Sequence, residues 1–128
     1  MTRRSRRSFV AAWLIAALAL ASGAGCDAEP PELEPPRLVL AEKMLGALHL
    51  TWVNPAPLCD AVEIERRTTT PDGAVTSGFA LVYSVPGVAD NKHDGAATED
   101  VTYGYRLRCQ KAGRFSSYSN ELSANPRR

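Results

Sequence analysis

The stretch that decides the fold reads Thr102-Tyr103-Gly104-Tyr105-Arg106-Leu107-Arg108-Cys109. Every second residue from Tyr103 to Cys109 is apolar or aromatic, whereas Arg106 and Arg108 occupy intervening positions. Successive side chains of an extended chain point to opposite faces, so a period of two predicts a β-strand with one buried face. The aromatic set should line a core, and the two arginines should face solvent.

The same alternation recurs through residues 37–126. Leu48, Leu50 and Trp52 alternate with polar neighbours, and Leu38 and Leu40 share one face of a short first strand. Further strands are expected over residues 62–65, 79–85 and 117–124, and turn signals separate them at Asn54-Pro55, Pro71-Asp72-Gly73, Pro86-Gly87, Asp94-Gly95 and Ala112-Gly113. No segment after residue 25 keeps a helical period. The pattern predicts an all-β fold, a single seven-stranded antiparallel β-sandwich of the immunoglobulin-like kind.

Three of these strands resemble those of a fibronectin type III domain. The matching motifs are Leu48-His49-Leu50-Thr51-Trp52, Val62-Glu63-Ile64-Glu65-Arg66 and Thr102 to Cys109, similar to strands B, C and F, with Ser117-Tyr118-Ser119-Asn120-Glu121 similar to the closing strand of bacterial members. The resemblance covers residues 37–126. It implies that Trp52 is the core tryptophan and that Tyr103 is the tyrosine-corner residue, whose hydroxyl bonds to the backbone of the preceding corner. His93 and Cys109 depart from the usual residues of the family.

The first 25 residues have the pattern of a signal peptide. Arginines at positions 3, 4, 6 and 7 precede an apolar run over residues 9–21, which is shorter than the roughly 20 residues that span a bilayer. The following Ala24-Gly25-Cys26 resembles the end of a lipobox, although Gly23 stands where leucine is usual. This resemblance implies a bacterial lipoprotein, exported and anchored to the cell envelope by lipid on Cys26. The alternative is cleavage by the ordinary signal peptidase, which leaves Cys26 a plain thiol.

The sequence is compatible with two export pathways and with either the inner or the outer membrane. Arg6 and Arg7, followed by Ser8 and Phe9, resemble the twin-arginine export motif, but an arginine-rich signal peptide for the general pathway reads the same way. Asp27 resembles an inner-membrane retention signal of some lineages, so inner and outer membranes, and periplasmic and surface sides, are all compatible. Residues 26–36 hold Cys26 and a Pro- and Glu-rich linker, expected to be an extended tether. Residues 127–128 form a C-terminal tail.

Charge excludes two classes of partner. Four of the 15 basic residues lie before Cys26 and all 14 acidic residues lie after it, so the processed chain would carry a net charge of about −3. Nucleic-acid binding needs concentrated lysine and arginine, and electrostatic binding to anionic lipid needs the same. We therefore expect no nucleic-acid partner, and a membrane link through the lipid alone.

With Cys26 acylated, Cys59 and Cys109 remain as an even pair in an exported protein, which favours a disulfide. The expected sandwich brings both to one pole, and closing a loop of about 50 residues contributes roughly 4 kcal/mol. A redox-active or metal-binding pair is the alternative, but the chain has no C-x-x-C, and neither histidine sits at ligand spacing. Across the same two strands, Glu63 and Glu65 should pair with Arg106 and Arg108.

No arrangement of residues indicates catalysis, a metal site or a cofactor other than the lipid. His93 and Asp94 are adjacent, but neighbours in a strand point to opposite faces and cannot form a dyad. We expect a non-catalytic, membrane-tethered module for protein–protein contact, adhesion or envelope scaffolding. The alternative is an accessory lipoprotein subunit of an envelope enzyme or secretion complex.

The expected topology also suggests where a partner would bind. The linker enters at the pole that holds the cysteine pair, so the opposite pole should face away from the membrane, and Thr69, Asp72 and Glu99 are the candidate binding residues there. Carbohydrate binding would need exposed aromatic side chains. Phe115 and Tyr118 are the aromatic residues that are expected to lie outside the core.

Overall fold

A computed structural model of the chain describes residues 29–127. The expectations for Cys26, Arg6 and Arg7 fall outside the described residues. The described part is built from strands and contains no helix that could cross a membrane.

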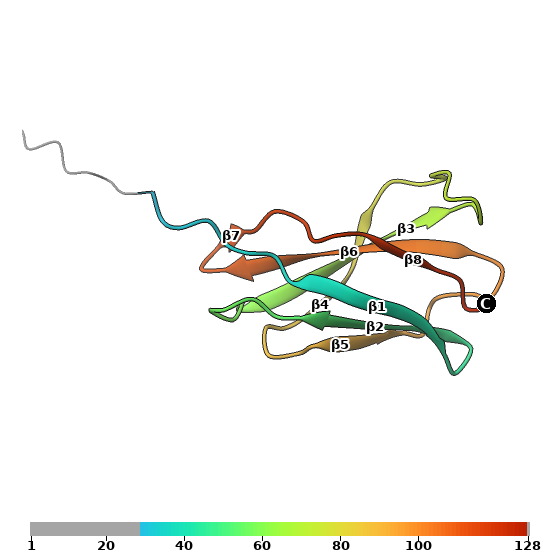
Figure 1. Cartoon of the computed structure of the whole chain (residues 1–128), viewed down its shortest axis with the longest axis horizontal. Helices are drawn as coiled ribbons and strands as arrows, with labels where there is room; N and C mark the ends of the chain where they lie inside the picture. Colours follow the sequence, from blue (N-terminus) through green and yellow to red (C-terminus); the bar gives the residue numbers. More distant parts are fainter. Residues whose placement is uncertain (1–28, 128) are drawn as a thin grey trace, which may run out of the picture.

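The strands form two antiparallel layers (Figure 1). One sheet has the order β1-β2-β5, and the other has the order β4-β3-β6-β7, with β8 also paired to β6. The bounds are β1 (Arg37–Met44), β2 (Ala47–Val53), β3 (Ala61–Thr69), β4 (Ala80–Pro86), β5 (Asn91–Asp94), β6 (Thr102–Lys111), β7 (Arg114–Phe115) and β8 (Leu122–Ala124). The predicted all-β antiparallel sandwich is confirmed. Of the last strand, expected over residues 117–124, only Leu122–Ala124 (β8) is present, and the short strand β7 precedes the expected segment.

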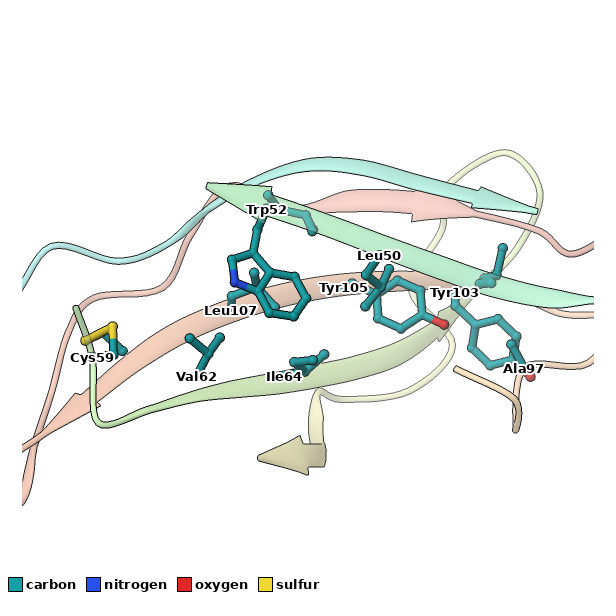
Figure 2. Packing of buried hydrophobic residues seen from close by; sticks show 12 residues of the cluster. Leu50, Trp52, Cys59, Val62, Ile64, Ala97, Tyr103, Tyr105 and Leu107 are labelled. Carbon is teal, nitrogen blue, oxygen red and sulfur yellow. A yellow bond between two sulfur atoms is a disulfide. The ribbon is translucent and has the colours of Figure 1, made fainter. Parts of the chain in front are cut away.

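The core lies where the apolar faces of the two sheets meet (Figure 2). Leu48, Leu50 and Trp52 of β2 are fully or almost fully buried. From the other sheet the buried side chains include Val62 and Ile64 of β3 and the alternating residues Tyr103, Tyr105, Leu107 and Cys109 of β6. Alternation therefore assigned the inner faces of β2, β3 and β6 correctly, because in a two-layer sandwich each such face can only be buried against the other sheet.

The first strand differs from the expected alternation. Its pairing with β2 shifts between Leu38 and Leu40, so Leu38 is 2% exposed and Leu40 is 42% exposed. A β-bulge adds a residue on one strand and reverses the facing of the residues after it. Ala41 consequently packs against the core in the place expected for Leu40.

Tyr103 occupies the corner position implied by the family resemblance. Its ring is buried, and its hydroxyl accepts a hydrogen bond of 3.1 Å from the backbone N–H of Thr98 in the connection between β5 and β6. Trp52 is buried as well, and its indole N–H donates to Asn54 Oδ1 at 3.0 Å. A buried aromatic with a satisfied polar atom stabilises the core without leaving an unpaired group.

The disulfide between Cys59 and Cys109 is present, with the two Cα atoms 5.4 Å apart and both residues buried. It joins the β2–β3 connection to the end of β6. The connection after β4 packs closely here, since a Cβ on Gly87 would lie 1.7 Å from the carbonyl oxygen of Cys59. Only glycine fits at that position.

The linker is less free than its composition predicts. Pro36 is fully buried, and the carbonyl of Pro31 accepts a hydrogen bond of 3.1 Å from Nη2 of Arg114. A cavity of about 380 Å³ lies between residues 31–34 of the linker and the pole that holds the disulfide, and Pro55 and Pro57 also line it. The expected extended tether thus ends in a segment that packs on the domain. The linker enters beside β7 (Figure 1) and lines the cavity together with Cys109, so the linker and the cysteine pair lie at the same pole, as the topology suggested.

Candidate functional site

The outer face of the β4-β3-β6-β7 sheet carries a row of alternating cationic and aromatic side chains. Arg106 lies between Phe79 and Tyr118, with its guanidinium carbon 4.0 Å and 3.5 Å from the two ring centroids. Arg108 lies between Tyr118 and Phe115, at 5.4 Å and 3.9 Å. We call the set of six the arginine–aromatic ladder: Arg67, Phe79, Arg106, Tyr118, Arg108 and Phe115, where Arg67 stacks on the other side of Phe79 at 4.5 Å.

Each arginine of the ladder is also paired with a carboxylate. Arg106 meets Glu65 at 2.6 Å and Arg108 meets Glu63 at 2.7 Å, which confirms the predicted pairing between β3 and β6. Arg67 meets Glu121 at 2.6 Å, and the hydroxyl of Tyr118 donates to Glu65 at 2.8 Å. A guanidinium held by a carboxylate at its edge and by aromatic rings on its faces has little freedom left. The ladder is therefore a rigid surface with its charges balanced.

Two serines hold the aromatic residues of the ladder against β6. The backbone N–H groups of Cys109 and Leu107 donate to the hydroxyls of Ser116 and Ser119, both at 2.8 Å. The two serines return backbone hydrogen bonds to the carbonyls of the same β6 residues, at 2.9 Å and 2.7 Å. Side chains replace strand carbonyls as acceptors here, which is why residues 116–121 are not a regular strand. The resulting path lays Phe115 and Tyr118 over Arg108.

The ladder keeps its aromatic residues accessible. Phe115 is 50% exposed and Tyr118 is 37% exposed. Exposed aromatic side chains next to arginine have the composition of energetically dominant residues in protein interfaces. Because every guanidinium already has a carboxylate partner, the surface offers flat apolar area and aromatic edges and has no surplus charge for an anion.

The candidate residues of the opposite pole do not form one surface. Thr69 is 6% exposed, and its hydroxyl is directed to the carbonyl of Thr102, so its side chain is not available to a partner. Alternation puts Thr69 on the outer face of β3 with Glu65 and Arg67, but the segment that follows β3 turns back and pairs with it through a bridge to Val75. Asp72 and Glu99 are exposed. The Asp72 carboxylate accepts a hydrogen bond from the hydroxyl of Thr70 in its own turn.

Asp94 is a buried carboxylate that sequence reasoning missed. It is fully buried at the end of β5 and accepts hydrogen bonds from three side chains of the facing sheet. Arg66 Nη1 lies 2.7 Å from Oδ2, the hydroxyl of Tyr105 lies 2.6 Å from Oδ2, and the hydroxyl of Tyr83 lies 2.8 Å from Oδ1. The signal was in the sequence, because an outward His93 requires Asp94 to point inward.

These contacts set the protonation state of the group. Burial by itself would raise the pKa of Asp94, but hydrogen bonds from Tyr105, Arg66 and Tyr83 outweigh it and hold the pKa below the ordinary 3.8. Burial and the bond to Asp94 raise the pKa of Tyr105. Asp94 is thus an anion. Its carboxylate accepts four hydrogen bonds, one of them from the backbone N–H of Ala96 at 3.2 Å, and all four come from groups within the fold. It links the two sheets.

The part of the chain that the structure describes holds few other candidates for metal binding or catalysis. Residues 29–127 contain no group of three or more histidine, cysteine, aspartate or glutamate side chains placed to hold a metal ion. Cys59 and Cys109 are joined in the disulfide, so neither has a free thiol. His93 is exposed and Asp94 is buried, so the two point to opposite faces as expected.

The sequence matches no family model and no curated protein. Its structure is similar to a Fn3-like protein from Clostridium thermocellum, with a TM-score of 0.56 and 22% identity over 70% of this chain and 88% of that one. It is also similar to the fn3 domain of the human collagen alpha-1(XX) chain, with a TM-score of 0.52 and 18% identity over 75% of this chain and 83% of the other. Pectate lyase PelI from Erwinia chrysanthemi gives a TM-score of 0.57 at 15% identity over 73% of this chain.

These similarities establish a fibronectin type III-like fold, as the motifs around Trp52 and Tyr103 implied. The chain spans only 28% of the pectate lyase chain that it matches.

Proposed function

We propose that this protein is a non-catalytic, lipid-anchored module that presents its fibronectin type III-like domain to another protein through the arginine–aromatic ladder. The observation that supports this function is the exposure of Phe115 and Tyr118 on a surface that is already rigid. Binding to a preorganised surface avoids most of the entropy cost of ordering side chains. The arginines of that surface come from β3 and β6, whereas Phe79 and Tyr118 come from the irregular segments beside them.

The binding role is tested by crosslinking in intact cells. Substituting both Phe115 and Tyr118 by alanine is expected to weaken binding of the crosslinked partner by at least about 30-fold, because a single interface residue of this kind contributes about 2 kcal/mol or more. Val88→Ala is the matched control, since Val88 is an exposed apolar residue outside the ladder. The proposal would be contradicted if the double variant crosslinked as well as the parent while Asp72→Ala or Glu99→Ala lost the crosslink. That result would assign binding to the opposite pole.

The anchor rests on the lipobox-like Ala24-Gly25-Cys26 and is tested separately. Mass spectrometry of the processed N-terminus should find Cys26 as the first residue, carrying acyl chains. Cys26→Ala should abolish that modification and release the protein from the membrane fraction. An N-terminus at another residue, or an unmodified thiol at Cys26, would contradict the anchor and leave the binding role to stand on its own test.

The alternative function is an accessory lipoprotein subunit of an envelope enzyme or secretion complex. One observation favours it, namely that pectate lyase PelI, a longer chain, contains a region of similar fold. A subunit should crosslink to one partner in fixed stoichiometry, whereas an adhesion module should give varied contacts or contacts between cells. The same crosslinking experiment separates the two.

A further inference from the structure

The chain contains two histidines, and folding places them directly opposite each other. His49 lies in β2 and His93 in β5, and the register of the β1-β2-β5 sheet pairs the two residues. Opposed residues on antiparallel strands have Cβ atoms about 5 Å apart, close enough for their side chains to share a ligand. We propose that this pair forms a two-imidazole site for a divalent first-row transition-metal ion such as Zn²⁺ or Cu²⁺.

The two rings are already near a chelating arrangement. Their centroids are 6.2 Å apart and their planes are tilted by 38°. A tetrahedral ion with two Zn–N bonds of about 2 Å places the centres of its imidazoles roughly 5 Å apart. An adjustment of about 1 Å in the side chains would therefore bring both rings onto one ion, and exposed strand residues have that freedom.

Neither imidazole has another role in the described residues. No hydrogen bond involves either ring, and Nδ1 of His49 is buried without a partner. A histidine that serves only the fold usually fixes its tautomer through a hydrogen bond. Here no hydrogen bond competes with a metal for either ring, and since Nδ1 of His49 is shielded from solvent, Nε2 is the nitrogen of His49 left to bind an ion. His93 is exposed and His49 is half-buried, so an ion can reach them from solvent.

The class of ion follows from the ligands. Imidazole nitrogen suits zinc, copper and nickel, whereas calcium and magnesium prefer oxygen. Two protein ligands leave the remaining positions to water, which makes this an open site of modest affinity. Glu42 of β1 stands next to His49 in the same register, and its exposed carboxylate is the acidic group that the sheet places beside the pair.

The proposal is tested by calorimetric titration of the full chain, without a polyhistidine tag, with zinc chloride at neutral pH. We expect one ion per chain with a dissociation constant on the order of 10 µM, since four-ligand zinc sites bind far more tightly. His49→Gln and His93→Gln should each weaken binding at least about tenfold, because losing even an outer partner of a ligand costs that much. Thr51→Val is the matched control, because Thr51 lies two residues after His49 on the same face of β2, and it should bind as the parent does.

A spectroscopic readout identifies the ligands directly. Cu²⁺ added to the parent should show nitrogen splitting from two imidazoles in electron paramagnetic resonance, and from one in each histidine variant. The proposal is overturned if the parent fails to bind zinc at millimolar concentration, or if a histidine variant binds as tightly as the parent. Circular dichroism of the metal-free variants should match the parent, which separates loss of the site from loss of the fold.

Discussion

Replacement of Cys59 and Cys109 by alanine is expected to lower the free energy of unfolding by about 4 kcal/mol. The bridge closes a loop with a sequence separation of 50, and in the chain-entropy model the lost cross-link gives the unfolded chain that much additional freedom. A domain of this size is stabilised by roughly 5–15 kcal/mol in total, so the change removes a large share. Urea denaturation of the parent and the double variant measures the difference.

The single variant Cys59→Ala is the control for this prediction. It breaks the same bond while leaving Cys109 in place, so it should be nearly as unstable as the double variant. If the double variant lies within about 1 kcal/mol of the parent, the disulfide contributes little, and the burial of the two cysteines would account for the remainder. Reduction of the parent should also be slow without denaturant, because both cysteines are buried.

Substitution of Asp94 by asparagine is expected to lower the free energy of unfolding by about 3 kcal/mol. Asparagine keeps the shape but removes the charge that Arg66, Tyr83 and Tyr105 contact, and breaking one partner of a buried ion pair leaves the other uncompensated. Arg66 is 22% exposed in its side chain, so water recovers part of the loss. Chemical denaturation measures the effect.

A double-mutant cycle tests whether the ion pair carries this cost. Arg66→Met alone should also destabilise the domain, and the variant with both substitutions should lose less than the sum of the two, because the second change removes an already unpaired charge. Tyr83→Phe is the mild comparison and should cost about 1 kcal/mol for one hydrogen bond. Additive losses at Asp94 and Arg66 would show that the two side chains act independently.

The contribution of Asp94 depends on pH with a definite sign. Its pKa is lowered in the folded protein, so the carboxylate stabilises the fold fully above its ordinary 3.8, and this stabilisation is lost as pH falls through the folded value. The stability difference between the parent and Asp94→Asn should therefore be constant near neutral pH and shrink below about pH 4. A difference that grows on acidification would contradict the low pKa.

Alternation in the sequence predicted much of this fold. The inner faces of β2, β3 and β6, the pairing of Glu63 and Glu65 with arginines, and the disulfide all follow from a period of two and an even number of remaining cysteines. The prediction failed at Leu40 and along residues 117–124. The bulge in β1 and the segment held by Ser116 and Ser119 change which strand residues pair. Neither changes the pattern of apolar and polar residues, so a single sequence gives no sign of them.

The candidate site was predicted only in part. Phe115 and Tyr118 were identified as aromatic residues outside the core, but Thr69 was wrongly placed on the surface. The arginine–aromatic ladder needs Phe79 from the segment before β4, two arginines of β6 and Tyr118 from beyond it, and sequence distance gives no sign of their stacking.

The sequence by itself determined the buried faces of β2, β3 and β6, because removing the apolar face of an alternating strand from water is favourable. The comparisons added that the sandwich is of the fibronectin type III-like kind. Only the tertiary structure decided which distant residues meet. Strand register aligned His49 with His93, and the packing of one sheet on the other brought Asp94 to Arg66 and Tyr105. Both depend on bulges and turns far along the chain. In the stretch from Thr102 to Cys109, the inner face and the carboxylate partners of Arg106 and Arg108 were predictable from the sequence, whereas the aromatic rings that stack on these arginines were not.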